Sequence, residues 1–196
     1  MTGGPEGTRP ARPGAAPAPV PGWVYWITGL AGAGKTTLGE ALVARLRARG
    51  RAAVLLDGNA LRAAFEHDLG YGCEDRRRAA RRYARLARLL AAQGVDAVVA
   101  TISMFHEVRA WSRAHVPRYY EVYLRAAPAT RTARRPLAGR ARGVVGVDLP
   151  FEEPARADLV VDVDACAGAA DVAERAWAAI LERLGEPGNG DGLGLH

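Results

Sequence analysis

The stretch Gly29-Leu30-Ala31-Gly32-Ala33-Gly34-Lys35-Thr36 matches the pattern G-x-x-x-x-G-K-[ST], which is typical of loops that cradle phosphate groups. The apolar run 23–27 before it predicts a strand, and the run 37–49 after it carries apolar residues at helical spacing. The motif requires a strand before it and a helix after it. We therefore predict a strand–loop–helix unit in which the N-terminus of the helix faces the glycines.

The chemistry of this phosphate loop, residues 29–36, indicates the triphosphate of ATP. Glycines without a Cβ let successive backbone N–H groups converge on one spot, and the helix end adds its positive dipole. Lys35 is the only lysine among 27 lysine and arginine residues, and its compact ammonium suits the β- and γ-phosphates better than a planar guanidinium. The Thr36 hydroxyl is predicted to hold Mg²⁺. The predicted ATP contacts are Gly29, Ala31, Gly32, Ala33, Gly34, Lys35, Thr36 and Thr37, and Lys35 is also a predicted catalytic residue.

The whole chain has the size and composition of one globular domain. It has 196 residues, of which 49% are hydrophobic and 24% charged. Residues 1–22 are rich in Gly, Pro and Ala without an apolar signal-peptide core, which predicts a disordered tail; 23–184 should form the domain and 185–196 a flexible tail. The longest apolar runs have strand length, so we expect no membrane span and no membrane partner.

Cysteine content and charge limit the cellular compartments and the classes of partner that we expect. Cys73 and Cys166 are far apart and lack a C-x-x-C spacing, which indicates neither a disulfide framework nor a zinc site and favours a cytoplasmic protein. The formal net charge of +6 suggests a nucleic-acid partner, but the arginines are spread over several elements without a nucleic-acid-binding signature. We therefore expect the positive field to steer small anionic ligands. The oligomeric state stays open, with a homodimer as one candidate.

Strand-length apolar runs and helical patterns alternate along the domain. Strands are predicted at 23–27, 52–56, 95–102, 119–124 and 159–163, and helices at 37–49, from 61, at 74–93, around 108–116, from 128 and at 171–184. Each crossover is long enough for a helix, which predicts an α/β fold: a five-stranded parallel sheet with helices on both faces, as in P-loop kinases. The irregular stretch 131–147 is predicted to be a short lid. Its arginines, which are candidates to stabilise the transferred group, are Arg131, Arg134, Arg135, Arg140 and Arg142.

Several polar residues are predicted to face the ligand end of this sheet. Asp57 follows the strand 52–56, and Ser103 follows the strand 95–102, at the carboxyl ends where open α/β sheets bind ligands. Asp57 is a predicted catalytic base or ligand of Mg²⁺ or its water, with a turn or helix N-cap role as the alternative. Arg76 continues the inward stripe that runs through Tyr83, so it should face the cleft and bind an anion, and Arg109 is a further candidate. The remaining arginines of helix 74–93 that share one face, predicted to be solvated, are Arg77, Arg81, Arg85 and Arg88.

Seven short motifs carry a further signal: G-L-A-G-A-G-K-T-T at 29–37, L-L-D-G-N-A-L-R at 55–62, L-G-Y at 69–71, E-D-R at 74–76, I-S-M-F at 102–105, E-V-Y at 121–123 and G-V-D-L-P-F-E at 146–152. Together they resemble the adenylylsulfate kinase family, over roughly residues 23–163. The resemblance implies ATP-dependent phosphorylation of the 3′-hydroxyl of adenylylsulfate, which gives 3′-phosphoadenylylsulfate in sulfate assimilation. The acceptor-binding residues that the resemblance implies are Asn59, Arg62, Tyr71, Arg76, Ile102 and Ser103.

The positions that depart from that family's pattern lie on the acceptor side. They are Asn59 in place of the second Asp of D-G-D, Ala79 in place of Asn, Met104 in place of Pro, and Val144 in place of a Phe expected to stack on the acceptor adenine. The lid is also shorter. An amide cannot take a proton, and losing one stacking partner costs about 1–3 kcal/mol. Two alternatives therefore stay open: the same transfer to another nucleotide conjugate or a small alcohol, and a nucleotide-binding regulator that does not catalyse.

Overall fold

The computed structural model describes residues 19–102, 105–134 and 144–185. Its centre is one sheet made of β1 (Val24–Thr28), β2 (Ala53–Asp57), β3 (Asp96–Ala100), β4 (Tyr119–Arg125) and β5 (Leu159–Asp162). The strands lie in the order β2-β3-β1-β4-β5, and every neighbouring pair is parallel. The predicted five-stranded parallel sheet is therefore confirmed.

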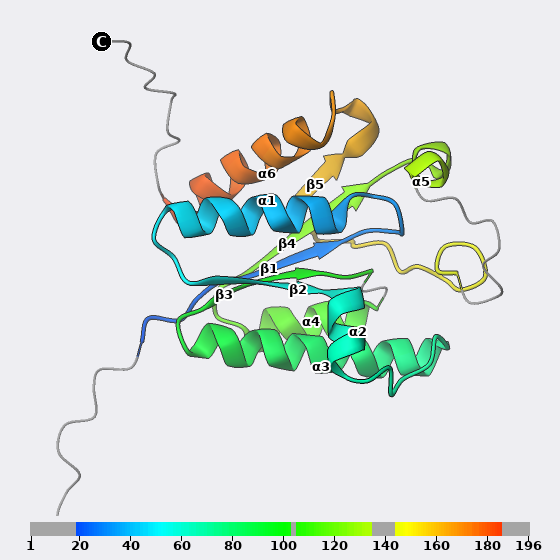
Figure 1. The fold of residues 1–196 in the computed structure, drawn as a ribbon, viewed down its shortest axis with the longest axis horizontal. Coiled ribbons are helices and arrows are strands. Elements are labelled where there is room, and N and C mark those ends of the chain that lie inside the picture. Colours follow the sequence, from blue (N-terminus) through cyan, green and yellow to red (C-terminus); the bar gives the residue numbers. More distant parts are fainter. Residues whose placement is uncertain (1–18, 103–104, 135–143, 186–196) are drawn as a thin grey trace, which may run out of the picture.

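Two layers of helices cover the sheet. Helices α1 (Lys35–Ala48) and α6 (Ala169–Leu184) lie on one face, and α3 (Cys73–Ala92) and α4 (His106–His115) lie on the other (Figure 1). Side chains of the central strand β1 alternate between the two cores, because successive residues of a strand point to opposite faces. Trp26 packs in the core under α3 and α4, whereas Ile27 packs in the core under α1 and α6. Burial on both faces explains why β1 and β3 are continuous apolar runs.

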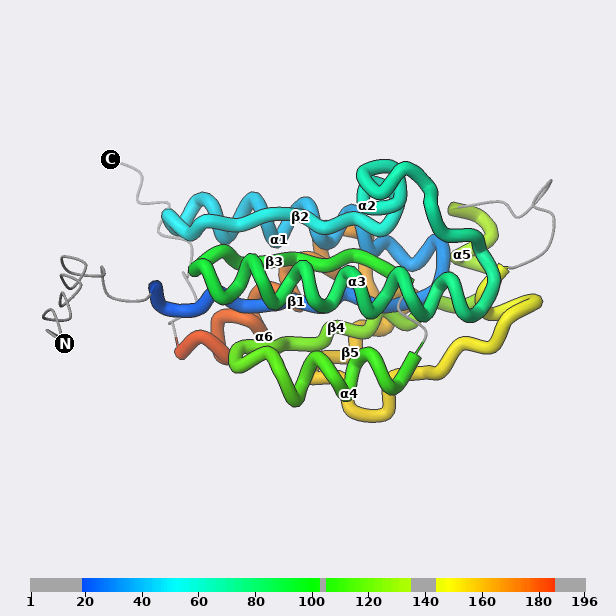
Figure 2. The backbone as a smooth tube through the Cα atoms, turned by 90° about the horizontal axis from the view of Figure 1, so that it is seen from below, coloured from blue at the N-terminus to red at the C-terminus, as the bar shows by residue number. Residues whose placement is uncertain are grey.

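The short elements gather where the parallel strands end. Helices α2 (Gly58–Ala64) and α5 (Pro128–Arg134) and the beginning of α1 lie at this same end in both views (Figures 1 and 2). Because all five strands run in one direction, the phosphate loop after β1 and Asp57 at the end of β2 reach a common edge. The fold thus builds its polar site from segments that are far apart in the sequence.

Some local predictions need correction. The predicted strand 95–102 is shorter, since β3 ends at Ala100 and the backbone N–H of Thr101 donates to the Ile27 carbonyl. Of the four arginines predicted to lie on a solvated face, Arg81, Arg85 and Arg88 are exposed, whereas Arg77 is only partly exposed. The guanidinium of Arg77 lies over the ring of Phe105 and pairs with Glu74 and Glu107. The predicted tails lie largely outside the described residues, as does 135–143 of the predicted lid.

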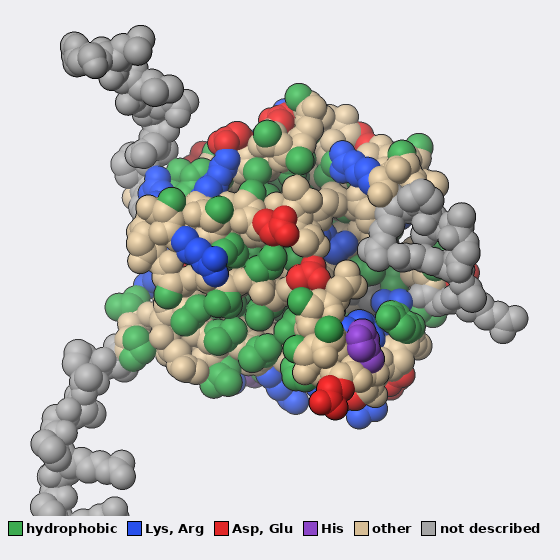
Figure 3. Space-filling model, viewed as in Figure 1, with side chains coloured by type: hydrophobic (Ala, Val, Ile, Leu, Met, Phe, Trp, Pro, Cys, Tyr) green, Lys and Arg blue, Asp and Glu red, His purple; other side chains and the backbone are tan. Residues whose placement is uncertain are grey.

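The surface gives two further observations. On the face seen in Figure 3, basic side chains are interspersed with acidic and apolar ones rather than gathered into one stripe. Among the described residues, no helix combines the length and apolar character needed to cross a membrane.

Candidate functional site

The phosphate loop has the backbone that a phosphate cradle requires. Gly29, Gly32 and Gly34 all have positive φ angles, of 146°, 84° and 96°. At Gly32 a side chain is excluded by close packing as well, because a Cβ would lie 2.6 Å from the carbonyl oxygen of Arg131. Gly34 is the N-cap of α1, and no acidic residue lies in the first turn of that helix. The positive helix end is therefore open to an anion, and these residues fit the phosphates of ATP.

The two side chains that follow the glycines point to different partners. Lys35 is half-buried and its ammonium Nζ donates to the Leu30 carbonyl at 2.9 Å, so the side chain curls back over the phosphate loop. The hydroxyl of Thr36 donates to Oδ2 of Asp57 at 2.7 Å. The sequence-predicted residues of β2 and of the phosphate loop are thus in direct contact.

The two carboxylate oxygens of Asp57 have different partners. Its Oδ1 accepts the backbone N–H groups of Asn59 at 2.8 Å and Ala60 at 3.2 Å, which makes Asp57 the N-cap of α2. Its Oδ2 faces Thr36. The N-cap interpretation left open from the sequence is therefore confirmed. The other oxygen faces the phosphate loop, and its role as a catalytic base or Mg²⁺ ligand stays a prediction.

This hydroxyl–carboxylate pair has the donor chemistry of a Mg²⁺ site. Mg²⁺ prefers oxygen ligands and usually keeps several waters, and it is held by one or two protein groups together with substrate phosphates. Thr36 and Asp57 would supply the protein ligands. Among the described residues no group of three or more His, Cys, Asp and Glu could hold a metal ion.

Two arginines meet at one aromatic ring beyond α2. The guanidinium of Arg62 donates to the carbonyls of Leu69 at 2.9 Å and Gly70 at 3.2 Å, and its carbon lies 4.4 Å from the ring centre of Tyr71. Arg76 donates from Nε to the Tyr71 carbonyl at 2.8 Å, and its guanidinium carbon lies 5.4 Å from the same ring. Burial lowers the pKa of Arg76, and the neighbouring charge of Arg62 lowers this pKa further. Two cations held this close favour an anionic ligand.

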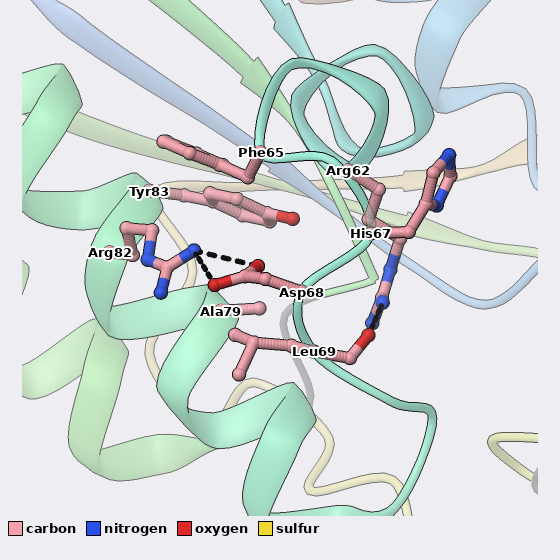
Figure 4. A pocket seen from close by; sticks show the side chains of 8 residues that line it. All are labelled: Arg62, Phe65, His67, Asp68, Leu69, Ala79, Arg82 and Tyr83. Carbon is pink, nitrogen blue, oxygen red and sulfur yellow. Dashed lines mark hydrogen bonds and ion pairs between the residues drawn. The ribbon is translucent and has the colours of Figure 1, made fainter.

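A small cavity lies behind Arg62, between α2 and α3 (Figure 4). Its volume of about 10 Å³ gives room for about one water molecule. Ala79 forms part of the wall, and the Asp68–Arg82 ion pair, with contacts of 2.9 and 3.0 Å, closes one side. The lining residues are Arg62, Phe65, His67, Asp68, Leu69, Ala79, Arg82 and Tyr83. The small side chain at position 79 thus leaves space next to a predicted acceptor-binding arginine.

The remaining predicted residues lie as follows. Ile102 follows β3, and its carbonyl accepts the hydroxyl of Thr28 at 2.6 Å. Asn59 is exposed in the first turn of α2, and Thr37 is exposed in the first turn of α1. Ser103 lies outside the described residues, as do Met104, Arg135, Arg140 and Arg142.

Two lid arginines are next to the phosphate loop. The backbone of Arg131 packs on Gly32, and Nη1 of Arg134 lies 3.9 Å from the point where a Cβ of Gly34 would be. Both belong to α5, which follows β4. Of the five arginines considered from the sequence, these two are placed beside the predicted phosphate position.

A buried ion network near α4 was missed in the sequence. Arg109 was expected to face the cleft, and this is wrong because it is 4% exposed and pairs with Glu121 at 3.3 Å. Arg113 also pairs with Glu121, at 3.1 Å, and with Asp158, at 2.8 Å. Burial raises the pKa of Glu121, and the two arginines oppose this rise. The sequence feature that could have revealed this network is the charged residue Glu121 within the strand-length apolar run 119–124.

Breaking this network should destabilise the protein. Glu121→Gln leaves the buried guanidinium of Arg109 without its counter-charge, so we expect a loss of about 3–5 kcal/mol in the free energy of unfolding, measured by urea denaturation. Glu107→Gln is the matched control, because Glu107 is half-exposed and pairs with Arg77 and Arg81 at the surface; it should cost less than about 1 kcal/mol. Equal losses in the free energy of unfolding of the two variants would show that burial of the Glu121–Arg109 ion pair does not increase its contribution to stability.

The parallel sheet, the phosphate loop after β1 and the contact between Thr36 and Asp57 define a P-loop kinase. A family model described as adenylylsulphate kinase matches residues 21–162. The chain belongs to the adenylylsulphate kinase family, and it is therefore a phosphotransferase with a hydroxyl acceptor.

Individual relatives differ in the acceptor that their names give. The chain is 42% identical to the adenylyl-sulfate kinase of Paraburkholderia xenovorans over 151 aligned residues. The aligned region covers 73% of this chain and 84% of that relative. The chain is 36% identical over 147 residues to the cytidine diphosphoramidate kinase of Campylobacter jejuni, and the aligned region covers 71% of this chain and 85% of that relative. The solved APS kinase of Mycobacterium tuberculosis in complex with AMPPNP and APS superposes with a TM-score of 0.75 at 29% identity, covering 83% of this chain and 99% of that one. The chain also spans 29% of the length of a probable bifunctional SAT/APS kinase 2 of Sorangium cellulosum, at 36% identity over 85% of this chain.

Proposed function

We propose that this protein transfers the γ-phosphoryl group of ATP to the 3′-hydroxyl of adenylylsulfate, giving ADP and 3′-phosphoadenylylsulfate. The observation that carries the proposal is that the predicted ATP-binding residues and the predicted acceptor-binding arginines lie at the same edge of the sheet. Asp57 begins α2 while in contact with Thr36 of the phosphate loop, and Arg62 lies on the same short helix. The pair of cations at Tyr71 is therefore only about one turn of helix beyond the ATP-binding residues. Family membership supports the same assignment.

The donor half of the site positions and neutralises the triphosphate. The backbone of residues 29–34 and the end of α1 would hold the phosphates, and Lys35 would exchange the Leu30 carbonyl for phosphate oxygens. Mg²⁺ bound at Thr36 and Asp57 would supply further neutralisation of charge. Arg131 and Arg134 are the candidates to contact the transferred group, because α5 packs on the phosphate loop.

The acceptor half orients the hydroxyl for in-line attack. The acceptor oxygen forms a bond to the γ-phosphorus while the bond from that phosphorus to the bridging oxygen of ADP breaks, and the hydroxyl proton passes to the carboxylate of Asp57. Arg62 and Arg76 would bind the anionic part of the acceptor with charge-assisted hydrogen bonds. Most of the rate enhancement then comes from positioning and electrostatics.

Replacing one acceptor arginine tests this assignment. Arg76→Ala should raise the KM for adenylylsulfate about 10- to 100-fold, since a hydrogen bond to a charged group contributes about 1.5–3 kcal/mol, while the KM for ATP changes less than about twofold. Coupled-assay kinetics with each substrate varied in turn measure both constants. Arg78→Ala is the control on the same helix, because the Arg78 side chain is exposed and its one ion pair, with Asp75, is long at 3.9 Å. A rise confined to the KM for ATP would contradict the placement of Arg76.

A second candidate keeps the chemistry and changes the acceptor to another nucleotide conjugate. The relative named cytidine diphosphoramidate kinase shares 36% identity with this chain, and Ala79 leaves a cavity beside Arg62. Incubation with ATP and a mixture of adenylylsulfate, cytidine diphosphoramidate and small alcohols distinguishes the two candidates. Mass spectrometry of the phosphorylated products identifies the acceptor that is used.

We also propose a cytoplasmic location, because the two half-buried cysteines are both free, as in reducing compartments. The assembly state stays a prediction, with the homodimer as its simplest form. Residues 23–184 are proposed as the folded domain.

A further inference from the structure

Helix α5, which carries Arg131 and Arg134, lies beyond the ends of the strands rather than on a face of the sheet (Figure 1). None of the seven residues of this helix is buried. Apolar burial therefore contributes little to its position, and polar contacts carry most of the work of holding it in place. The side chain that makes these contacts is that of Asp164, which the proposed mechanism does not use.

Asp164 holds α5 from a different part of the chain. It lies in the short 3₁₀-helix η1 (Val163–Ala165), directly after β5. Its Oδ2 accepts the backbone N–H of Ala127 at 2.6 Å, and its Oδ1 accepts the hydroxyl of Thr130. Ala127 directly precedes α5 and has no side-chain acceptor of its own. The hydrogen bond from Thr130, followed by that from Ala127, lowers the pKa of Asp164, so the carboxylate stays charged near neutral pH.

The position of Asp164 is itself fixed by the two strands at this edge of the sheet. Oδ1 of Asp162, the last residue of β5, accepts the backbone N–H of Asp164 at 3.2 Å. Oδ2 of Asp162 pairs at 3.1 Å with Arg125, the last residue of β4. Between the two aspartates, Val163 is buried in the core under α1 and α6. Asp164 is therefore anchored to the sheet rather than carried by a free loop.

On its other side, α5 meets the phosphate loop at two glycines. The carbonyl oxygen and the Cα of Arg131 lie 2.6 and 3.0 Å from the point where a Cβ of Gly32 would be, so backbone packs directly on backbone here. Nη1 of Arg134 lies 3.9 Å from the corresponding point of Gly34. Described contacts therefore run without a gap from β5 through Asp164 and α5 to the phosphate loop.

We propose that Asp164 is a positioning residue for the ATP half of the site. By holding Ala127 and Thr130 it sets the place of α5, and with it the place of the Arg131 backbone on the phosphate loop and of the Arg134 guanidinium beside that loop. The inference rests on the proposed function, because it takes residues 29–36 to bind ATP. A site of this kind works only when its supporting contacts hold the reacting groups close to the productive geometry. Loss of the Asp164 contacts should therefore impair the use of ATP and leave acceptor binding unchanged.

Three variants test the proposal. Asp164→Ala removes both hydrogen bonds, and Thr130→Val removes one of them while keeping the shape of the side chain. Asp164→Asn is the conservative variant, because its amide oxygen can accept the Ala127 N–H while its amide nitrogen donates to the Thr130 hydroxyl. Asp171→Ala is the matched control: the Asp171 carboxylate accepts the Ala167 N–H at 3.0 Å and pairs with Arg175 at 2.9 Å, so it supports the beginning of α6 instead of α5.

Three measurements are combined on each variant. Steady-state kinetics vary ATP and adenylylsulfate in turn, and calorimetry measures binding of the non-hydrolysable analogue AMPPNP with Mg²⁺. Hydrogen exchange follows the amides of Ala127 and of residues 129–134.

The expected result for Asp164→Ala is a fall of about tenfold or more in kcat/KM for ATP, with the KM for adenylylsulfate changed less than about twofold. Exchange of the Ala127 amide should be at least about tenfold faster in this variant. Thr130→Val should show smaller changes in the same direction, and Asp164→Asn and Asp171→Ala should behave as wild type.

Three results would overturn the proposal: equal changes in the constants for both substrates, unaltered exchange at Ala127, or an Asp164→Asn variant as impaired as Asp164→Ala. If the wild-type protein binds AMPPNP but does not phosphorylate adenylylsulfate, the proposed function fails. Calorimetry and exchange then still decide whether Asp164 positions α5 for nucleotide binding.

Discussion

Lys35→Met is expected to lower kcat by about 10³-fold or more. The ammonium of Lys35 sits inside the phosphate loop, where its Nζ donates to the Leu30 carbonyl, and no other lysine exists in the chain to replace it. A methionine has a similar length but carries no charge to offset the negative charge that develops on the phosphates. The measurement is the rate of ADP formation in the presence of acceptor.

Two controls separate loss of chemistry from loss of fold. The folded state of Lys35→Met should lose only about 0.5–1.5 kcal/mol, the contribution of one hydrogen bond, so its thermal unfolding should stay close to wild type. Lys35→Arg should also be strongly impaired, since a planar guanidinium does not fit a cradle built for a point charge. Near-wild-type turnover in Lys35→Met would show that the phosphate loop does not carry catalysis.

Asp57→Asn is expected to lower kcat by about 10²–10⁴-fold while leaving the fold intact. The amide oxygen can still accept the N–H groups of Asn59 and Ala60, and Asn is as good an N-cap as Asp, so α2 should keep its stability. The amide cannot take a proton, and it is a weaker ligand of Mg²⁺. The substitution therefore separates the capping role of Asp57 from its chemical role.

The dependence on metal gives a second readout of the same variant. If Asp57 holds Mg²⁺ together with Thr36, the Asn variant should need a higher Mg²⁺ concentration for half-maximal activity. Glu107→Gln is the control, because it makes the same carboxylate-to-amide change in a half-exposed ion pair away from the phosphate loop, and its dependence on Mg²⁺ should match that of the wild type. A fully active Asp57→Asn enzyme would reduce Asp57 to a helix cap.

The fold and the donor half could be predicted from the sequence because both follow local rules. A strand, a glycine-rich turn and a helix in direct succession define the phosphate loop, and parallel strands bring their carboxyl ends to one edge. The contact between Thr36 and Asp57 is a consequence of those two rules. Helical periodicity predicted that Arg76 faces the cleft; in the structure it is half-buried and contacts Tyr71, whose own ring is exposed, so its role at the acceptor stays a prediction.

The other features depend on tertiary packing that has no local signature. Arg109 looks like any arginine on an amphipathic helix, and only the position of Glu121 on the neighbouring strand shows that it is buried and paired. The contact between Thr28 and Ile102 joins residues 74 positions apart. Ala79 is one of many alanines in α3, and the cavity beside it forms only where Arg62 and the segment 65–69 after α2 lie against that helix.

The most direct test is identification of the product that the purified protein forms from ATP and Mg²⁺ with adenylylsulfate and cytidine diphosphoramidate in equal amounts. Mass spectrometry of the nucleotides distinguishes 3′-phosphoadenylylsulfate from the phosphorylated cytidine compound. We expect 3′-phosphoadenylylsulfate as the main product, with a kcat/KM of at least about 10⁴ M⁻¹ s⁻¹ for adenylylsulfate. Phosphorylation of cytidine diphosphoramidate while adenylylsulfate stays unchanged would contradict the proposed function.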